Sequence, residues 1–333
     1  MDLVQSKSGP PLSLPRAIAV GYKRMRALVK TKSGLNFTEV PVKAPGAGEV
    51  TVRVQCAGLC RTDLQVAAGE LATEFPRILG HECSGVICRL GAGVDQARLG
   101  ERVAVFPWLA CGACEFCRND QDKLGYLCPQ RKFLGWQVDG CFAEFLVLPA
   151  DRCFPLGEEI DFQAGAYFEP LTAALGVNRA PLKQARTVAV MGGNRIAALT
   201  SLVLSECAQV EHDLLEPGKA HENSYDLVIE SEATPEKISI ALHSLRPNGV
   251  LVLKSRPPGP VDWPVRLQVE KELTVTAFSY GSPRLARLLL EKRPQLFRPL
   301  WQNPVPLSNW KAEFEREWAG MEDKKVFFQP QIG

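Results

Sequence analysis

The most constraining feature of this sequence is a cluster of four cysteines between positions 111 and 128. Cys111, Cys114, Cys117 and Cys128 follow the spacing C-x2-C-x2-C-x10-C. The short gaps let backbone turns aim several thiolates at one ion, and four such ligands are typical of a closed tetrahedral zinc site. Because a closed site has no open coordination position, we expect this zinc to stabilise one lobe and to do no chemistry. Free surface thiols or a redox-active cluster are the alternatives.

The cysteine count agrees with metal binding in a reducing compartment. The chain has 11 cysteines, an odd number, and its first 23 residues contain no apolar stretch long enough for a secretory signal. We therefore expect a cytoplasmic protein without a disulfide framework. Residues 1–24, rich in Ser, Pro and Lys, are predicted to be a flexible extension, with a transit peptide as the alternative.

Charge and hydropathy exclude two classes of partner. The chain has 39 Lys and Arg against 37 Asp and Glu, which gives no electrostatic case for nucleic acid. No apolar run approaches the ~18 residues that span a bilayer. We expect a small-molecule substrate, with no nucleic-acid partner and no membrane partner.

The two halves of the chain differ in their hydrophobic pattern. The first half consists of short strand-like runs separated by glycine turns, such as residues 50–54, which alternate with period two. From residue 161 onward, apolar strands alternate with helices, beginning with a helix over 162–177 and a buried strand over 187–191. This alternation predicts an α/β fold whose second part is a parallel sheet covered on both faces.

Cysteine, histidine and carboxylate residues in three separate segments make a second candidate metal site. They are Cys60, His81 and Glu82, followed much later by Glu169. A mixed set of this kind leaves room on zinc for a water or a substrate, which the metal then polarises. Thr62 is near enough to Cys60 in sequence to pass a proton to or from a bound alcohol. Taken one at a time, these residues favour the alternative without metal, in which His81 caps a turn and Glu169 begins a helix.

Taken together and in order, the motifs resemble those of zinc-dependent medium-chain dehydrogenases. The matching segments are Gly-Leu-Cys-Arg-Thr-Asp at 58–63, Leu-Gly-His-Glu at 79–82, the four-cysteine lobe, Asp-Gly-Cys-Phe-Ala-Glu at 139–144 and Glu-Pro-Leu at 169–171. The Glu-Pro-Leu form is more similar to the sorbitol and threonine dehydrogenase branch than to the short-alcohol branch.

The resemblance implies a role for each matching residue. Cys60, His81 and Glu82 would bind a catalytic zinc, Glu169 would occupy the fourth position directly or through water, Thr62 would relay protons, and Arg61 would meet the cofactor pyrophosphate. It also implies a GroES-like β domain over 25–160, a Rossmann-type domain over 161–295 and a segment over 296–333 that returns to the first domain. Gln65 and Cys141 depart from the family pattern, and the last gap in the zinc lobe is three residues longer than usual.

The glycine motif for a dinucleotide is incomplete. After the predicted strand 187–191, the G-x-G-x-x-G register gives Gly192, Gly193, Asn194, Arg195, Ile196 and Ala197. Only the first glycine is in place, Ala197 is a tolerated third position, and Asn194 puts a side chain where the pyrophosphate approaches. The candidate cofactor-binding residues for NAD or NADP are thus Arg61, Gly192, Gly193, Asn194 and Asp213.

The parallel-sheet domain is also too short for a complete mononucleotide-binding half. Residues 193–225 separate Gly192 from the next clear strand, whereas helix, strand, helix and strand with their loops approach about 45 residues. A helix to about residue 207 and a short strand over 209–212 fit this space, so a helix and strand on the adenosine side are predicted to be missing. Asp213 or Glu216 would bind the ribose, or both are solvated loop acids.

Three functions follow from these observations. The chain is predicted to be a zinc-dependent NAD(P) dehydrogenase of secondary alcohols or polyols, holding one catalytic and one structural zinc. The alternatives are a zinc enzyme that has lost ordinary dinucleotide binding and does non-redox Lewis-acid chemistry, or a non-catalytic homologue. The apolar strand over 273–277 is predicted at the edge of the sheet, where the resembling family pairs across a two-fold axis, so we expect a homodimer.

Overall fold

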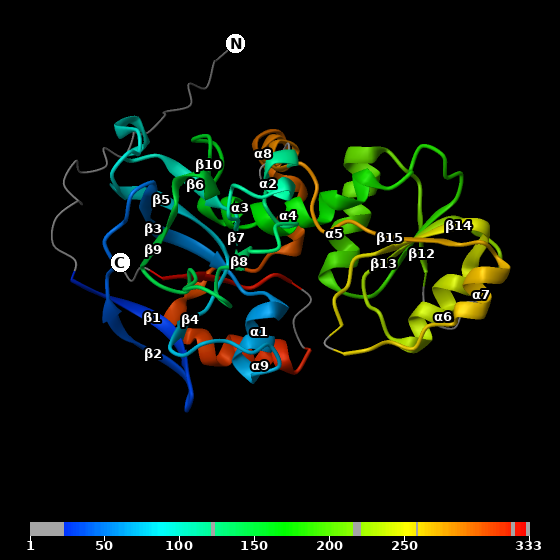
Figure 1. The fold of residues 1–333 in the computed structure, drawn as a ribbon, viewed down its shortest axis with the longest axis horizontal. Helices are drawn as coiled ribbons and strands as arrows, with labels where there is room; N and C mark the ends of the chain where they lie inside the picture. Colours follow the sequence, from blue (N-terminus) through cyan, green and yellow to red (C-terminus); the bar gives the residue numbers. More distant parts are fainter. Residues whose placement is uncertain (1–22, 121–123, 216–220, 258, 321–323, 331–333) are drawn as a thin grey trace, which may run out of the picture.

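The chain folds into two lobes that lie side by side along its longest axis (Figure 1). The computed structural model describes residues 23–120, 124–215, 221–257, 259–320 and 324–330. Nearly all of the predicted N-terminal extension lies outside these residues. None of the helices in the described ranges is both long and apolar enough to cross a membrane.

The first lobe is built around one central antiparallel strand. β3 (Glu49–Gly58) pairs with β5 (Glu82–Leu90), β9 (Phe145–Pro149) and β17 (Phe327–Gln329). Its valines at every second position are fully buried, as the period-two pattern predicts. The other elements of this lobe are β1 (Arg24–Thr31), β2 (Gly34–Pro41), β4 (Arg77–Ile78), β6 (Arg102–Val105), β7 (Trp108–Leu109), β8 (Lys132–Phe133), β10 (Cys153–Pro155), β16 (Val305–Pro306), α1 (Arg61–Ala68), α2 (Glu115–Asn119) and α9 (Trp310–Trp318).

Two short helices connect the lobes. The sequence predicts one helix over 162–177, but the structure has α3 (Phe162–Ala166) and α4 (Phe168–Ala174), followed by a 3-10 turn. Pro170 explains the break, because proline has no N–H to donate and is tolerated only in the first turn of a helix. The helix therefore restarts at Phe168, which places Glu169 in the first turn of α4.

The second lobe is a parallel sheet with the strand order β12-β11-β13-β14-β15. β11 (Val188–Met191) is buried along its whole length, as a parallel strand covered on both faces should be. This observation confirms the predicted α/β class. The remaining elements of this lobe are β12 (Asp213–Leu215), β13 (Tyr225–Glu230), β14 (Leu245–Leu253), β15 (Thr274–Ala277), α5 (Arg195–Val203), α6 (Pro235–Ser244) and α7 (Val265–Glu270). α8 (Pro283–Lys292) follows the sheet in sequence and packs against α4 (Figure 1).

Within the described residues the sheet ends at β12, where a complete dinucleotide-binding sheet has one more strand. Only residues 216–224 separate β12 from β13, too few for the usual helix and strand. The short strand predicted over 209–212 lies instead at Asp213–Leu215. The reason is that α5 continues as a π-turn over Leu204–Ala208 and ends on Gln209 in a left-handed conformation, with φ at 52°, so the next strand begins later.

Candidate functional site

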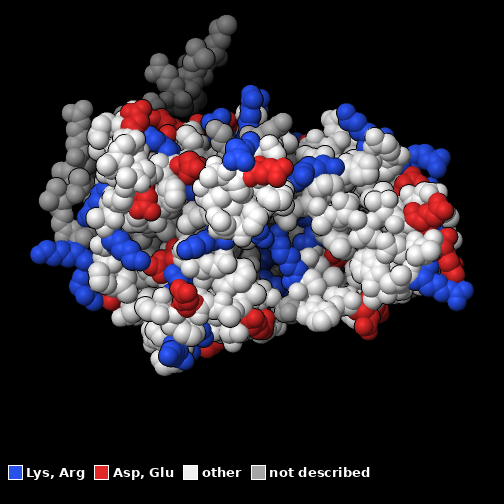
Figure 2. Space-filling model, in the orientation of Figure 1, with Lys and Arg blue, Asp and Glu red and all other residues white. Residues whose placement is uncertain are grey.

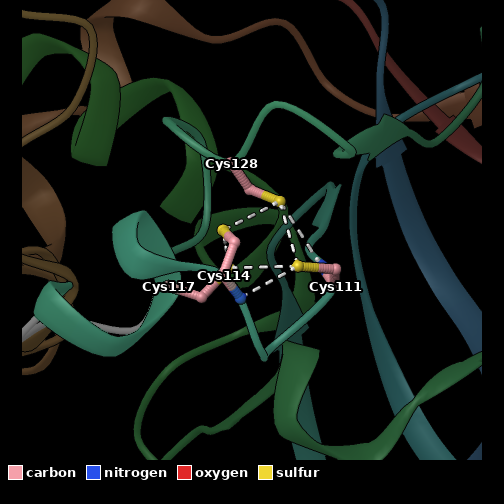
Figure 3. A group of neighbouring side chains, drawn as sticks. All are labelled: Cys111, Cys114, Cys117 and Cys128. Atoms are coloured by element: carbon pink, nitrogen blue, oxygen red, sulfur yellow. Dashed lines mark hydrogen bonds between the residues drawn. The ribbon is translucent and has the colours of Figure 1, made fainter.

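The four cysteines of the 111–128 segment converge from a loop, the start of α2 and a second loop (Figure 3). Their sulfur atoms lie 3.4–3.9 Å apart in the pairs that make contact. A tetrahedron with Zn–S bonds of about 2.3 Å has sulfur–sulfur edges of about 3.8 Å. The arrangement therefore fits a single zinc ion.

Backbone amides also prepare this cluster for metal. The amide of Cys114 donates to the sulfur of Cys111 at 3.4 Å, and the amide of Cys111 donates to the sulfur of Cys128 at 3.5 Å. Amides of residues 113 and 114 lower the pKa of the Cys111 thiol to about 6. Because zinc binds the thiolate, a lowered thiol pKa favours metal binding near neutral pH.

A second set of metal-ligating atoms lies at the end of β3 and the start of β5. One ligand atom each from Cys60, His81 and Glu82 lies within 4.8 Å of the others. Cys60 follows β3 and precedes α1, whereas Glu82 begins β5, so the antiparallel β3–β5 pair brings them together. His81 and Glu82 are buried and Cys60 is partly exposed, which leaves the set open on one side.

Asp63 holds this set in place from behind. One of its carboxylate oxygens accepts from the amide of Cys60 at 2.9 Å, and the other lies 3.1 Å from Nδ1 of His81 and accepts from the amide of Gly80 at 3.1 Å. Gly80 has φ at 92°, a conformation that side chains rarely adopt. A carboxylate behind a histidine fixes the ring so that its other nitrogen faces the metal. Burial alone would lower the pKa of His81, but Asp63 and Cys60 outweigh it and raise the pKa.

Lys325 contributes a buried positive charge to the set. Its Nζ lies 2.6 Å from Oε1 and 2.5 Å from Oε2 of Glu82. Gly58 makes room for this contact, because a Cβ there would lie 2.3 Å from Oε2 of Glu82. Burial would lower the pKa of Lys325, but Glu82 raises it. The centre therefore carries one cation of its own before any metal binds.

Glu169 and Thr62 lie beside the three-residue set and outside it. The carboxylate of Glu169 is buried and accepts a 2.6 Å hydrogen bond from the hydroxyl of Tyr280. Burial and the negative charge of Glu82 raise the pKa of Glu169. The hydroxyl of Thr62 lies 4.0 Å from the sulfur of Cys60.

The predicted cofactor loop joins β11 to α5. Gly192 has φ at 128°, and a Cβ there would lie 2.2 Å from Oγ of Ser231, so only glycine fits. Asn194 caps α5: its Oδ1 accepts from the amide of Ala197 at 3.0 Å, and its Nδ2 donates to the carbonyl of Ser231 at 2.7 Å. The side chain is thus held against its own helix, and Gly193 lies open, with no atom within 4 Å of the place of a Cβ.

Arg195, which follows the cofactor loop, contacts the first lobe. Its guanidinium makes a two-pronged ion pair with Glu317 of α9, with Nη2 to Oε2 at 3.0 Å, and donates to the carbonyl of Lys324 at 3.0 Å. Burial alone would lower the pKa of Arg195, but Glu317 raises it, and the charges of Cys60 and Glu82 add to this effect. The cofactor loop and the metal set therefore face each other.

The remaining cofactor candidates have different surroundings. Arg61 is exposed at the first residue of α1. Asp213 is not part of the site: it begins β12, pairs with Ala189 rather than with the end of β11, and accepts a 2.9 Å hydrogen bond from Tyr225. The prediction for Asp213 fails because the strand starts later than expected, and Glu216 lies outside the described residues. Lys and Arg atoms gather in the hollow between the two lobes, which suits an anionic ligand (Figure 2).

Sequence reasoning did not assign roles to Asp63, Tyr280, Arg195 or Lys325. Asp63 had a local signal, because it stands three residues after Cys60 at the capping-box position in the first turn of α1. The other three act on partners that are more than 100 residues away in the chain. No short spacing in the sequence reveals such contacts.

Comparison with known proteins agrees with this architecture. The model of the alcohol dehydrogenase GroES-like domain matches residues 46–158. The chain is 28% identical over 274 residues to a protein named probable D-xylulose reductase A from Aspergillus clavatus, covering 70% of this chain and 76% of that one. It is 27% identical over 266 residues to sorbitol dehydrogenase of Bacillus subtilis, covering 69% and 74% of the two chains.

A solved structure extends the likeness over both lobes. The Escherichia coli alcohol dehydrogenase RspB, determined with NADH, superposes with a TM-score of 0.83 at 24% identity, covering 92% of this chain and 99% of that one. At this identity the superposition establishes the shared fold, including the arrangement of the two lobes.

Proposed function

The chain belongs to the medium-chain alcohol dehydrogenase family, and on this premise we propose that it oxidises secondary alcohols or polyols with NAD or NADP at a zinc centre. The observation that carries the proposal is the group formed by Cys60, His81 and Glu82. Thiolate, imidazole and carboxylate are ligand types that zinc binds. Asp63 orients Cys60 and His81 through hydrogen bonds, and the set faces the cofactor loop.

Each residue of the proposed centre has a defined task. Cys60, His81 and Glu82 would hold the zinc, with Glu169 at the fourth position directly or through water. Zinc in such a site polarises the substrate oxygen and favours its deprotonated form. Thr62 would receive the proton of the alcohol, because its hydroxyl lies 4.0 Å from the sulfur of Cys60 and is only partly buried. The alcohol loses this proton and a hydride, and a ketone remains.

The cofactor would lie in the hollow between the lobes, where it supplies the hydride acceptor. The turn at Gly192, the open backbone at Gly193 and the start of α5 fit the pyrophosphate, with Arg61 and Arg195 as counter-charges. The adenosine side fits less well, because the strand beyond β12 is absent from the described sheet and Asp213 points to Tyr225. Loss of two or three hydrogen bonds there weakens binding by roughly tenfold to a thousandfold.

Nucleotide titration tests the proposal. We expect weak but measurable binding of NAD(H) or NADP(H) by calorimetry, and we expect Gly192→Val to reduce it further. Gly34→Val is the matched control, since Gly34 has φ at 131°, close to that of Gly192, but lies in the β1–β2 turn. A loss of affinity in the first variant alone assigns the loop.

The outcome also separates the alternatives. A protein that holds the Cys60-dependent zinc and binds neither nucleotide at millimolar concentration is not a dehydrogenase. That result would favour a zinc enzyme with non-redox Lewis-acid chemistry, for which the missing strand and the self-capped α5 are the supporting observations. A protein without the Cys60-dependent zinc would favour a non-catalytic role.

A further inference from the structure

Lys254 stands directly after β14, at the carboxyl end of the parallel sheet. Its ammonium donates to the backbone carbonyls of Ala173 at 2.6 Å and Phe278 at 2.7 Å, and lies 3.5 Å from that of Ser279. None of these acceptors is a carboxylate, so the contact is no ordinary ion pair. A partly buried lysine with this set of acceptors ties separate backbone segments together.

The tied segments are those that carry the Glu169–Tyr280 pair. Ala173 lies one turn after Glu169 in α4, and Ser279 directly precedes Tyr280. The two side chains meet in the 2.6 Å hydrogen bond between the Tyr280 hydroxyl and the Glu169 carboxylate. Lys254 therefore holds the two segments that carry this pair, through backbone carbonyls one to four residues away from Glu169 and Tyr280.

The seam between these segments is close-packed, so a change there is transmitted. A Cβ on Gly176 would lie 2.6 Å from the carbonyl of Phe278 and 3.0 Å from Nζ of Lys254. The amide of Gly281 donates to the carbonyl of Thr172 at 2.8 Å, and a Cβ on Gly281 would lie 2.4 Å from the backbone of Leu175. With glycine backbone on both sides of the seam, Lys254 is the long side chain that sets its width.

We propose that Lys254 is a positioning residue that fixes the Glu169 carboxylate and the Tyr280 hydroxyl against the metal set. The proposal rests on the proposed function only in giving Glu169 a place beside the zinc. It links the two lobes: the strand that ends at the cofactor side of the sheet determines where a carboxylate of the metal side stands. Displacing a catalytic group by about 1 Å can cost about a hundredfold in rate.

Lys271 provides a matched control within the same sheet. Its ammonium also donates to three backbone carbonyls, those of Leu242, His243 and Leu245, at 2.8–3.1 Å. It lies before β15 at the opposite end of the sheet, where β14 begins. Replacing either lysine by methionine removes an ammonium from three carbonyls, but only Lys254 touches the segments of the Glu169–Tyr280 pair.

The first experiment compares Lys254→Met with Lys271→Met in steady-state kinetics on the zinc-loaded protein. We expect kcat to fall roughly tenfold or more in Lys254→Met. The KM for the nucleotide should change less than about twofold, because the pyrophosphate side is untouched. Lys271→Met should keep the kcat of the unmodified protein per folded molecule, and Lys254→Arg should recover part of the loss. Equal kcat values in the two methionine variants would overturn the proposal.

A second readout needs no turnover. In protein loaded with Co²⁺, the visible absorption that disappears in Cys60→Ser reports on the geometry of the Cys60–His81–Glu82 centre. We expect Lys254→Met to shift this part of the spectrum and Lys271→Met to leave it unchanged. If the unmodified protein shows no turnover but Lys254→Met shifts the Co²⁺ spectrum, the dehydrogenase function is refuted and the positioning role is supported. If the unmodified protein turns over substrate and Lys254→Met shows neither a spectral shift nor a loss of kcat, only the positioning role is refuted.

Discussion

Lys325 and Glu82 form the buried ion pair whose removal tests the metal assignment most directly. Their side chains are only 8% and 2% exposed, and Nζ lies 2.6 Å from Oε1. Lys325→Met leaves the Glu82 carboxylate buried without a counter-charge. Breaking a buried pair in this way costs about 3–5 kcal/mol of unfolding free energy. A zinc ion on Glu82 supplies positive charge of its own and should reduce this cost to about half or less.

A double-mutant cycle isolates the effect of the metal. We would measure the unfolding free energy of Lys325→Met by urea denaturation with zinc present, once with Cys60 intact and once in Cys60→Ser. The four-cysteine site stays loaded in both backgrounds. We expect the full cost of about 3–5 kcal/mol in Cys60→Ser, where the metal is lost, and a clearly smaller cost with Cys60 intact.

An exposed ion pair serves as the control for the substitution itself. Lys43→Met removes the 2.7 Å contact with Asp139, but Lys43 is 74% exposed, so the change should stay within about 1 kcal/mol. By linkage, Lys325→Met should also bind the Cys60-dependent zinc more tightly, since the centre becomes more negative. The same cost of Lys325→Met in both backgrounds would refute the assignment of Cys60, His81 and Glu82 as metal ligands.

Four further predictions concern other parts of the molecule. Elemental analysis should find two zinc ions per chain, with Cys111→Ser losing one together with stability, and Cys60→Ser losing the other together with activity while the fold survives; fewer than one zinc contradicts the four-cysteine site. Glu317→Gln frees Arg195 for the pyrophosphate and should strengthen nucleotide binding roughly fivefold in calorimetry; an unchanged affinity argues against Arg195. We propose that β15 pairs with a second copy, so light scattering at micromolar concentration should show a dimer that Val275→Pro disrupts, and a monomer would refute this. Burial, together with the positive charges of Arg256 and Arg179, outweighs the opposing charge of Glu169 and lowers the pKa of Lys254 to about 7. The unfolded chain therefore binds a proton that the folded one lacks above this pH, and the stability of the unmodified protein relative to Lys254→Met should rise between pH 7.5 and 9.5 by up to about 1.4 kcal/mol per pH unit.

Local patterns predicted most of the fold. The alternating valines of β3 and the continuous apolar run of β11 each gave the right element, because burial on one or two faces leaves a direct trace in sequence. The short spacing of the four cysteines likewise predicted a cluster that the structure brings together. The predicted position of β12 was a few residues too early, because a strand of three residues carries almost no periodic signal and the preceding π-turn carries none.

The rest of the site depends on contacts between distant segments. Lys325 meets Glu82 only because β17 pairs with β3, and Tyr280 meets Glu169 only because the segment after β15 packs on α4. Strand pairing and helix packing determine these two side-chain contacts, and no local spacing in a single sequence predicts them. Lys254 is hidden for the same reason, since its acceptors are backbone carbonyls that carry no side-chain signature.

The insertion of β17 beside β3 also has a consequence for how the protein is made. Lys325 leaves the ribosome 243 residues after Glu82, which takes roughly 10–50 s at ordinary rates of translation. During that interval the nascent first lobe has a carboxylate at its centre with no lysine to neutralise it, and the last residues of β3, Ala57 and Gly58, lack the partner that β17 later supplies. The parallel sheet of the second lobe has all its strands by residue 277 and can form earlier. Zinc present during synthesis would then act as a substitute for Lys325 and hold the first lobe until β17 arrives.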